Sequence, residues 1–182
     1  MSTTLYTIGH GNRAVEDFIA LLQGAHIECV VDVRAYPRSR RNPPFSRLAL
    51  DPALRAHGIQ YVWEGAPLGG MRRPRAKSRH LALADAAYRG YADHMESADF
   101  QGALERLIAI GTSRRAAFMC AETNPDHCHR SFIADALLAR GIEVLHLVGP
   151  HDVRTHALRE GARLDTGRQV VYDACVQLGL PL

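Results

Sequence analysis

The sequence is short of lysine, of cysteine and of long apolar runs, and each shortage excludes a class of protein. Lys77 is the lone lysine, so arginine carries the positive charge, a bias that a GC-rich genome explains better than adaptation to nucleic acid. The four cysteines, Cys29, Cys120, Cys128 and Cys175, form no dense secreted disulfide framework. No apolar run is long enough for a signal peptide or a membrane span. We therefore expect a cytoplasmic protein with reduced thiols and no membrane partner.

Extreme composition is absent as well. The apolar fraction of 47% and the charged fraction of 23% are those of an ordinary globular chain, which excludes disorder and collagen-like repeats. The net charge of +3 permits an anionic ligand without requiring one. With 182 residues, no linker and no internal repeat, the chain is predicted to fold as one domain with a sizeable core. We expect residues 1–150 to form the α/β core and residues 151–182 to form a C-terminal extension packed on it.

Apolar runs alternate with amphipathic segments along the chain. The pattern predicts strands at 5–8, 27–33, 59–63, 116–119 and 142–148, and helices at 15–23, 46–57, 83–95, 100–110 and from about Cys128 to Gly141. The spacing between strands fits right-handed crossovers. We therefore predict a three-layer α/β domain with a mainly parallel central sheet, flanking helices and a short C-terminal hairpin that turns at Thr166 and Gly167. Candidate helix caps are Asn12, Ser46 and Asp99.

The most reactive side chains lie around the fourth predicted strand. Cys120 and Glu122 follow this strand, and Cys128, His129 and Arg130 begin the next helix. Ligands of an open α/β sheet collect beyond the carboxyl ends of its strands, and a helix N-terminus directs unpaired N–H groups to the same place. A thiol beside arginine and histidine in that setting is expected to have a lowered pKa.

Polar residues also follow the first two strands, namely His10, Asn12 and Arg13 after the first and Asp32, Arg34 and Arg38 after the second. The first of these loops lacks the third glycine of a dinucleotide fingerprint, although a phosphate site remains open. Prolines stiffen the second loop, and its arginines concentrate positive charge. Arg34 and Arg38 either clamp an anion or are solvated, whereas Arg40 and Arg41 are expected to be solvated. Residues 64–80 are too polar and glycine-rich for a packed element, so they are predicted to form either a functional lid or a disordered surface loop. Gly69 and Gly70 mark either a hinge in this loop or a place where its backbone approaches a ligand closely.

Several motifs between Tyr6 and about Leu147 carry a family resemblance: YTIGHGNRAVEDFIALL, VVDVRAYPRSRRNPPF, LGG with RRPR, YRGYADHM and CAETNPDHCHRSFIADALLARGIEVLHL. Together they resemble the bacterial and archaeal family catalogued as domain of unknown function 488. The resemblance implies no reaction, because that family is defined by sequence. It points to recurrent positions, which here are His10, Asn12, Arg13, Asp32, Arg34, Pro37, Arg38, Leu68 to Gly70, Cys120, Glu122, Cys128, His129 and Arg130.

Three chemistries fit a cleft in which these residues meet. In the first, a thiolate attacks an electrophile, a histidine moves protons, Glu122 orients the histidine, and arginines hold an anionic group. The catalytic residues are then Cys120, Glu122, Cys128, His129 and His10, and the substrate-binding residues are Asn12, Arg13, Arg34, Arg38, Gly69, Gly70 and Arg130. A thiol-phosphatase loop is excluded, since the residue six after Cys120 is Asp126 and not arginine.

In the second chemistry, Cys120, Cys128, either His127 or His129, and also His10 supply ligands to zinc, although no paired CxxC motif is present. In the third, the arginine-rich loops with Trp63, Tyr88 and Tyr91 bind nucleic acid or a nucleotide without covalent catalysis. Both thiols can instead be buried and inert, with Glu122 and Arg130 joined in an ion pair. We favour an enzyme acting on a small anionic or nucleotide-like substrate, with a nucleic-acid-binding module or a zinc-binding protein as the alternatives. No cofactor and no oligomeric state is indicated.

Overall fold

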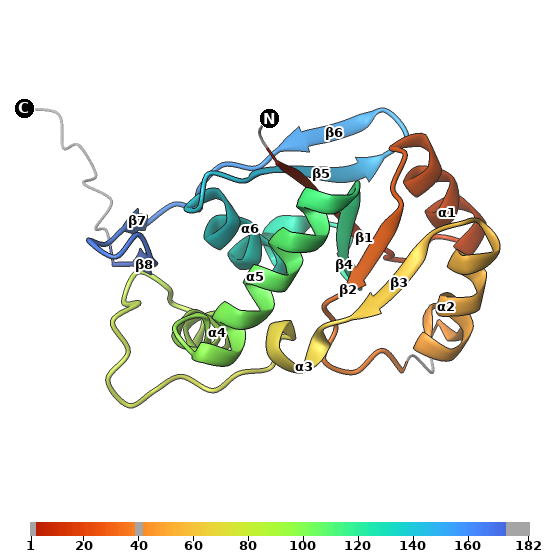
Figure 1. The fold of residues 1–182 in the computed structure, drawn as a ribbon. Helices are drawn as coiled ribbons and strands as arrows, with labels where there is room; N and C mark the ends of the chain where they lie inside the picture. The colour runs from red at the N-terminus through yellow and green to blue at the C-terminus, as the bar shows by residue number, and fades with distance from the viewer. Residues whose placement is uncertain (1–2, 39–41, 174–182) are drawn as a thin grey trace, which may run out of the picture.

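The fold is a three-layer α/β arrangement around a mainly parallel sheet, as predicted (Figure 1). The computed structural model describes residues 3–38 and 42–173. The sheet order is β3-β2-β4-β1-β5-β6, in which β6 alone is antiparallel to its neighbour. Its strands are β1 (Thr4–Gly9), β2 (Cys29–Asp32), β3 (Gln60–Trp63), β4 (Ala116–Cys120), β5 (Glu143–Gly149) and β6 (Asp152–Thr155). The predicted C-terminal hairpin is formed by β7 (Ala162–Leu164) and β8 (Val170–Tyr172).

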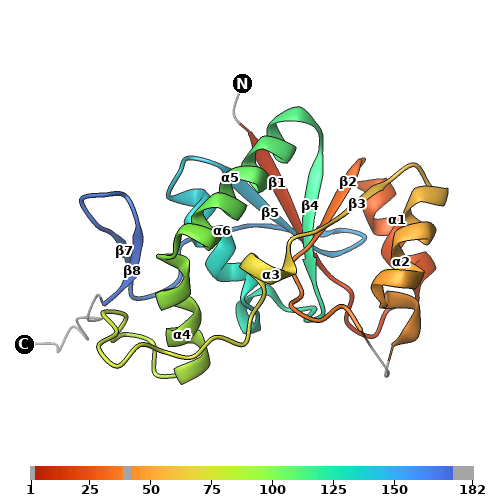
Figure 2. The same cartoon turned by 60° about the horizontal axis from the view of Figure 1, so that its bottom comes forward.

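Helices cover both faces of the sheet, and Figure 2 shows the sheet between the two helical layers. One layer consists of α1 (Val15–Gly24) and α2 (Arg47–Ala56), with the 3-10 turn η1 (Pro43–Phe45). The other consists of α5 (Ala98–Ser113) and α6 (Arg130–Leu138), extended by α3 (Gly65–Leu68) and α4 (Ala86–Met95). The 3-10 turn η2 (Pro125–His127) lies between β4 and α6.

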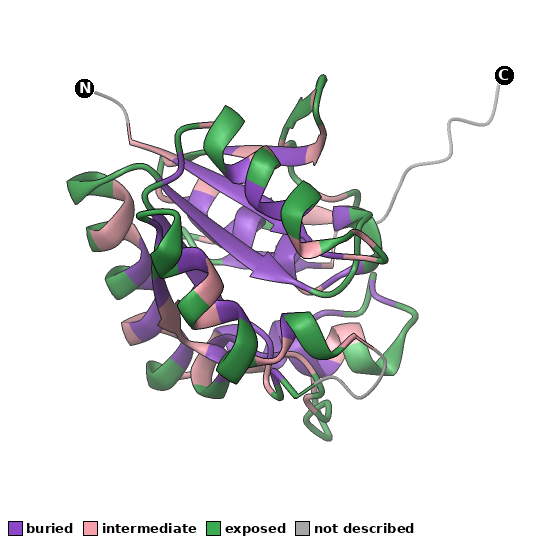
Figure 3. Ribbon diagram, turned by 90° about the vertical axis from the view of Figure 1, so that its right-hand side faces the viewer, coloured by how far each residue is buried: buried purple, intermediate pink, exposed green. Residues whose placement is uncertain are grey.

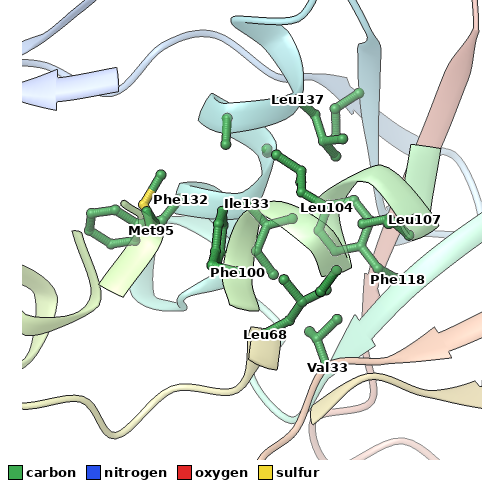
Figure 4. Packing of buried hydrophobic residues seen from close by; sticks show 14 of the residues in the cluster. Val33, Leu68, Met95, Phe100, Leu104, Leu107, Phe118, Phe132, Ile133 and Leu137 are labelled. Atoms are coloured by element: carbon green, nitrogen blue, oxygen red, sulfur yellow. The ribbon is translucent and has the colours of Figure 1, made fainter. Parts of the chain in front are cut away.

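Alternation along the strands divides the core into two clusters. On β1, Tyr6 and Ile8 pack towards α1, whereas Leu5 packs towards α5. Figure 4 shows the second cluster, in which Phe118 of β4 lies among Leu104, Leu107 and Ile133, which α5 and α6 supply. Each fully buried leucine, isoleucine or phenylalanine contributes roughly 1.5–3 kcal/mol. The central strands β1, β2 and β4 are buried along most of their length, while the helices α1, α2 and α5 each have a buried side and an exposed side (Figure 3).

Three carboxyl ends meet at one edge of the sheet, because β1, β4 and β2 are neighbours. Gly9 pairs with Cys120, and Asp32 pairs with Met119. The predicted adjacency of these strands is confirmed. The β4–α6 loop also crosses directly over β1, since a Cβ atom at Gly9 would lie 1.7 Å from the carbonyl oxygen of Glu122.

Several local predictions are wrong. Ser97, and not Asp99, caps α5 with a side-chain hydrogen bond, and Ala14, not Asn12, is the N-cap residue of α1. Ser46 is the N-cap residue of α2 as predicted, although its side chain makes no capping hydrogen bond. Segment 64–80 contains a short packed helix, α3, with Leu68 fully buried, so it is not entirely a loop.

The tail holds β6, a strand that the polar sequence after Pro150 did not predict. Cys29 is buried in the core as expected. Arg40, Arg41 and Cys175 lie outside the described residues. Within residues 3–38 and 42–173, none of the helices combines the length and apolar character needed to cross a bilayer.

Candidate functional site

A pocket of about 370 Å³ opens where β2 and β4 end, beneath the start of α4. Its lining residues include Arg34, Tyr36, Gly70, Met71, Tyr88, Tyr91, Cys120, Glu122, His127, Cys128 and His129. A larger hollow of about 780 Å³ lies beside α1 and β5, but of the predicted site residues it holds only Arg13. Both predicted cysteines therefore line the smaller pocket, which we call the thiol pocket.

Two thiols and an imidazole converge at the base of the thiol pocket. Cys120 is the last residue of β4, Cys128 precedes α6, and both are buried. The two Sγ atoms and a ring nitrogen of His129 all lie within 4.8 Å of one another. Nε2 of His129 is 3.0 Å from the carbonyl oxygen of Val33, which can only accept a hydrogen bond, so Nε2 carries the proton. The lone pair on Nδ1 then faces Sγ of Cys128 at 3.6 Å.

Arg130 is the cation that holds this cluster together, and it is 1% exposed. Its Nε donates to Sγ of Cys120 at 3.1 Å, and its backbone N–H donates to Sγ of Cys128 at 3.5 Å. Its remaining guanidinium N–H groups donate to Oγ1 of Thr7 at 2.7 Å and to the carbonyl oxygen of Glu122 at 2.5 Å. A single residue thus contacts both cysteines, and its side chain ties Cys120 to β1 and to the β4–α6 loop.

The environment makes the two thiols unequal. A hydrogen bond from Cys120 and the positive charge of Arg130 lower the pKa of Cys128 to about 7, against the opposing effect of burial. Burial raises the pKa of Cys120 well above its ordinary value, and its hydrogen bond to Cys128 adds to this shift. Burial also lowers the pKa of His129. The pair therefore loses its first proton near pH 7, mainly from Cys128, beside a neutral imidazole.

A buried chain of hydrogen bonds leads from Arg130 to the far side of α6. The guanidinium donates to Thr7, whose Oγ1 is 2.9 Å from Nδ1 of His146. Nε2 of His146 is 3.0 Å from Nδ1 of His156, and Nε2 of His156 is 2.8 Å from the Asp135 carboxylate. Arginine can only donate and a carboxylate can only accept, so the chain begins with a donor and ends with an acceptor. Every contact between them is satisfied if each group accepts from the side of Arg130 and donates towards Asp135. Burial lowers the pKa of His146 to about 3, so this ring stays neutral in the chain.

The wall of the thiol pocket at β2 carries a fixed cation. Arg34 donates to Asp32 through Nε at 2.9 Å and through a terminal nitrogen at 2.6 Å, and the Tyr61 hydroxyl donates to the same carboxylate at 2.6 Å. The other terminal nitrogen of Arg34 is 3.4 Å from Nε2 of His10. Burial lowers the pKa of His10, whose ring stacks on Phe45 with centroids 4.3 Å apart. Arg34 thus lines the pocket, whereas His10 contacts Arg34 and does not line the pocket.

The other predicted site residues divide between the pocket and its surroundings. Gly70 lines the pocket, where an added Cβ atom would lie 3.4 Å from Nδ1 of His129. Gly69 is packed away from it, with Ala35 and the carbonyl of Gly65 too close for a side chain. Arg13 donates to the carbonyl oxygens of Gly9, at 2.6 Å, and of Val148.

Three polar residues reach solvent. Asn12 is exposed, and Arg38 lies in a neighbouring hollow outside the thiol pocket. The Glu122 carboxylate is exposed at the rim, and Arg130 contacts its carbonyl oxygen instead, so no ion pair joins these two residues. His129 is oriented by the carbonyl of Val33, a role that we had predicted for Glu122.

The comparisons with known proteins can be set against this geometry. A family model described as "Domain of unknown function DUF488" matches residues 14–137, which is more than half of the chain. The chain belongs to the DUF488 family. The matched DUF488 segment includes Arg34, both pocket cysteines, His129 and Arg130, while Thr7 and His156 lie outside it. No curated protein and no solved structure matches the chain.

Four residues of the hydrogen-bond network in this DUF488 chain were not predicted as site residues: Thr7, Asp135, His146 and His156. A signal existed for the first and third, because both are polar residues in apolar strands and a buried polar group needs a partner. Thr7 and His146 are also register partners in the sheet. No local pattern connects Asp135 on α6 with His156 in the tail, which only the folded chain brings together.

The two thiols and the imidazole at the base of the thiol pocket are also suitable ligands for a metal ion. Two thiolates and one imidazole are ligands that zinc prefers, and three protein ligands leave a fourth position open. Metal-bound histidines usually donate their second N–H to a carbonyl, as Nε2 of His129 does to Val33. Cys120, Cys128 and His129 of this DUF488 protein are therefore the residues that could hold a metal ion.

Proposed function

We propose that this protein is an enzyme in which the Cys128 thiolate attacks an electrophilic atom of an anionic substrate. The observation that carries the proposal is the position of Cys128 Sγ at the start of α6, where it accepts the Arg130 N–H and lines a pocket that also holds Arg34. A thiolate stabilised by a helix N-terminus and an adjacent guanidinium is the usual form of a reactive cysteine. The proposed setting is the cytoplasm, where thiols stay reduced.

The roles of the surrounding residues follow from their contacts. Cys120 donates its S–H towards the thiolate and is held by Arg130, so it supports the nucleophile. Arg34 lines the pocket, and the terminal nitrogen that faces His10 carries a second N–H, which binds a negatively charged group of the substrate. When Cys128 forms its bond to the electrophile, the leaving group departs with the bonding electron pair. Nδ1 of His129, 3.6 Å from Cys128, is the nearest base for the proton of the water that then releases the product.

The test is the pH dependence of alkylation by iodoacetamide, read at each cysteine by peptide mass spectrometry. Cys128 is expected to react with an apparent pKa near 7, while Cys29, buried in β2 and with its pKa raised by burial, serves as the internal control and stays inert. Alkylation of Cys128 no faster than that of Cys29 at pH 7 would rule out a thiolate nucleophile.

A second candidate function is metal binding at Cys120, Cys128 and His129, favoured by the convergence of their three ligand atoms. A bound zinc ion would mask both thiols, so they would resist alkylation until a chelator was added. Elemental analysis of the purified protein, together with alkylation before and after chelation, separates the two candidates. One equivalent of zinc with inert thiols supports the metal site, whereas fast alkylation without chelation supports the thiolate enzyme.

A further inference from the structure

A second hollow continues from the thiol pocket along the surface. It measures about 1130 Å³ and runs between the loop after β2 and the first turns of α2. Ala35 and Tyr36 line both hollows, so the two adjoin and form one surface path, with the cysteines in the first hollow and Trp63 in the second. We call the second hollow the outer groove.

Large apolar side chains stand in solvent along this path. Tyr36 is 75% exposed and Leu48 is 90% exposed in the outer groove, and Met71 is 83% exposed at the thiol pocket. The backbone of Met71 has a φ of 65°, a left-handed conformation that a side chain rarely adopts. Strained residues and clustered exposed apolar side chains both mark binding surfaces. The path therefore has flat and apolar contact area for a ligand larger than the thiol pocket itself.

The outer groove also carries uncompensated positive charge. In the part of the chain that the structure describes, neither Arg38 nor Arg47 forms an ion pair, and both are exposed. Asp51 is the acidic residue of the groove, and it is bonded to Arg55 at 2.5 Å. The guanidinium of Arg47 lies over the Trp63 ring, 5.2 Å from its centroid. The outer groove therefore combines two cations with the aromatic side chains of Tyr36 and Trp63.

We propose that the outer groove binds single-stranded nucleic acid, so that the substrate of the thiol site is a nucleotide within a polynucleotide. This inference rests on the proposed function for the reaction itself. A base stacks on the exposed ring of Tyr36, and phosphates contact Arg38 and Arg47, the combination by which single strands are held without reading their sequence. The Nε1–H of Trp63 donates to the carbonyl of Arg34 at 3.0 Å, which ties this wall of the outer groove to a residue that lines the thiol pocket. An acidic peptide would match the charge but would leave the ring of Tyr36 without a planar partner.

The experiment measures binding of a fluorescein-labelled oligothymidylate of about 12 nucleotides, within the range of single-strand sites, by anisotropy over a series of salt concentrations. Tyr36→Ala is expected to weaken binding on the order of tenfold at every salt concentration. Arg38→Ala and Arg47→Ala are each expected to reduce the slope of log K against log salt by about 0.7. Arg163→Ala is the matched control, since this exposed arginine on the hairpin is paired with Asp173, and it should bind like the wild type.

The inference would be overturned by the absence of binding at low salt or by equal binding of all four variants. Tighter binding of polyglutamate than of the oligonucleotide would also overturn it in favour of an acidic peptide. Iodoacetamide reactivity of Cys128 is measured on the same preparations. Fast alkylation without nucleic-acid binding removes the groove assignment alone, while slow alkylation at Cys128 refutes the proposed function.

Discussion

Replacing Thr7 with valine removes the central link of the hydrogen-bond chain while keeping the shape of the side chain. Thr7 is fully buried, and valine retains its β-branch, so the change opens no cavity. Two buried groups lose their partner, a terminal nitrogen of Arg130 and Nδ1 of His146. Each unpaired buried group costs about 1–3 kcal/mol, so the free energy of unfolding is expected to fall by about 2–6 kcal/mol. That is a large part of the roughly 5–15 kcal/mol that stabilises a typical domain.

Urea denaturation followed by circular dichroism measures this loss. Thr7→Ser is the matched control, because it keeps the hydroxyl and is expected to stay much closer to the wild type. The variants should also differ in chemistry, since Arg130 positions Cys120 and Cys128. Alkylation of Cys128 at pH 7 is expected to slow in Thr7→Val and to recover in Thr7→Ser. A valine variant as stable as the serine variant would refute the reasoning, because the hydroxyl would then have no role in the chain.

Three further perturbations test separate parts of the structure. Gly9→Ala places a methyl group 1.7 Å from the carbonyl oxygen of Glu122 and is expected to lower the melting temperature sharply, whereas Gly24→Ala, with open space around it, should raise it slightly. His146 binds a proton more readily when unfolded, at its ordinary pKa of 6.5, than when folded, at about 3. Its contribution to stability is therefore lost as pH falls between these values, by up to about 1.4 kcal/mol per pH unit, and His146→Gln should flatten that part of the urea-denaturation profile. Arg130→Lys keeps the charge but not the fork of donors, so Cys128 alkylation at pH 7 should slow by about tenfold or more; an unchanged rate would show that charge alone suffices.

The layers of the fold could be predicted because buried strands and helices have characteristic patterns of apolar residues in the sequence. The run at 27–33 is apolar because β2 has neighbours on both sides and helices on both faces, and the amphipathic pattern of α5 records one buried face. The sequence of β6 has no such apolar pattern, since β6 is an edge strand whose residues are mostly exposed. The short helix α3 was hidden by its glycines, which are there because Gly65 and Gly69 pack against backbone.

The thiol pocket was predictable for a related reason. Cys120 and Arg34 each follow an apolar strand, and parallel strands place such residues at one edge of the sheet. The partners of those residues were harder to predict, because contacts with a backbone carbonyl have no sequence signature. The carbonyl groups of Val33 and Glu122 orient His129 and Arg130, and any residue type could supply them.

The position of β1 in the middle of the sheet has a consequence for how the chain is made. A ribosome produces this strand first, yet both of its neighbours, β4 and β5, come from the second half of the chain. Thr7 and His146 lie 139 residues apart, so the nascent strand stays without its permanent partners through most of synthesis. Pairings of such long range form slowly and leave apolar edges exposed meanwhile. The thiol pocket is assembled around this late junction, and the reactivity of Cys128 should therefore appear only when the last parallel strand has taken its place.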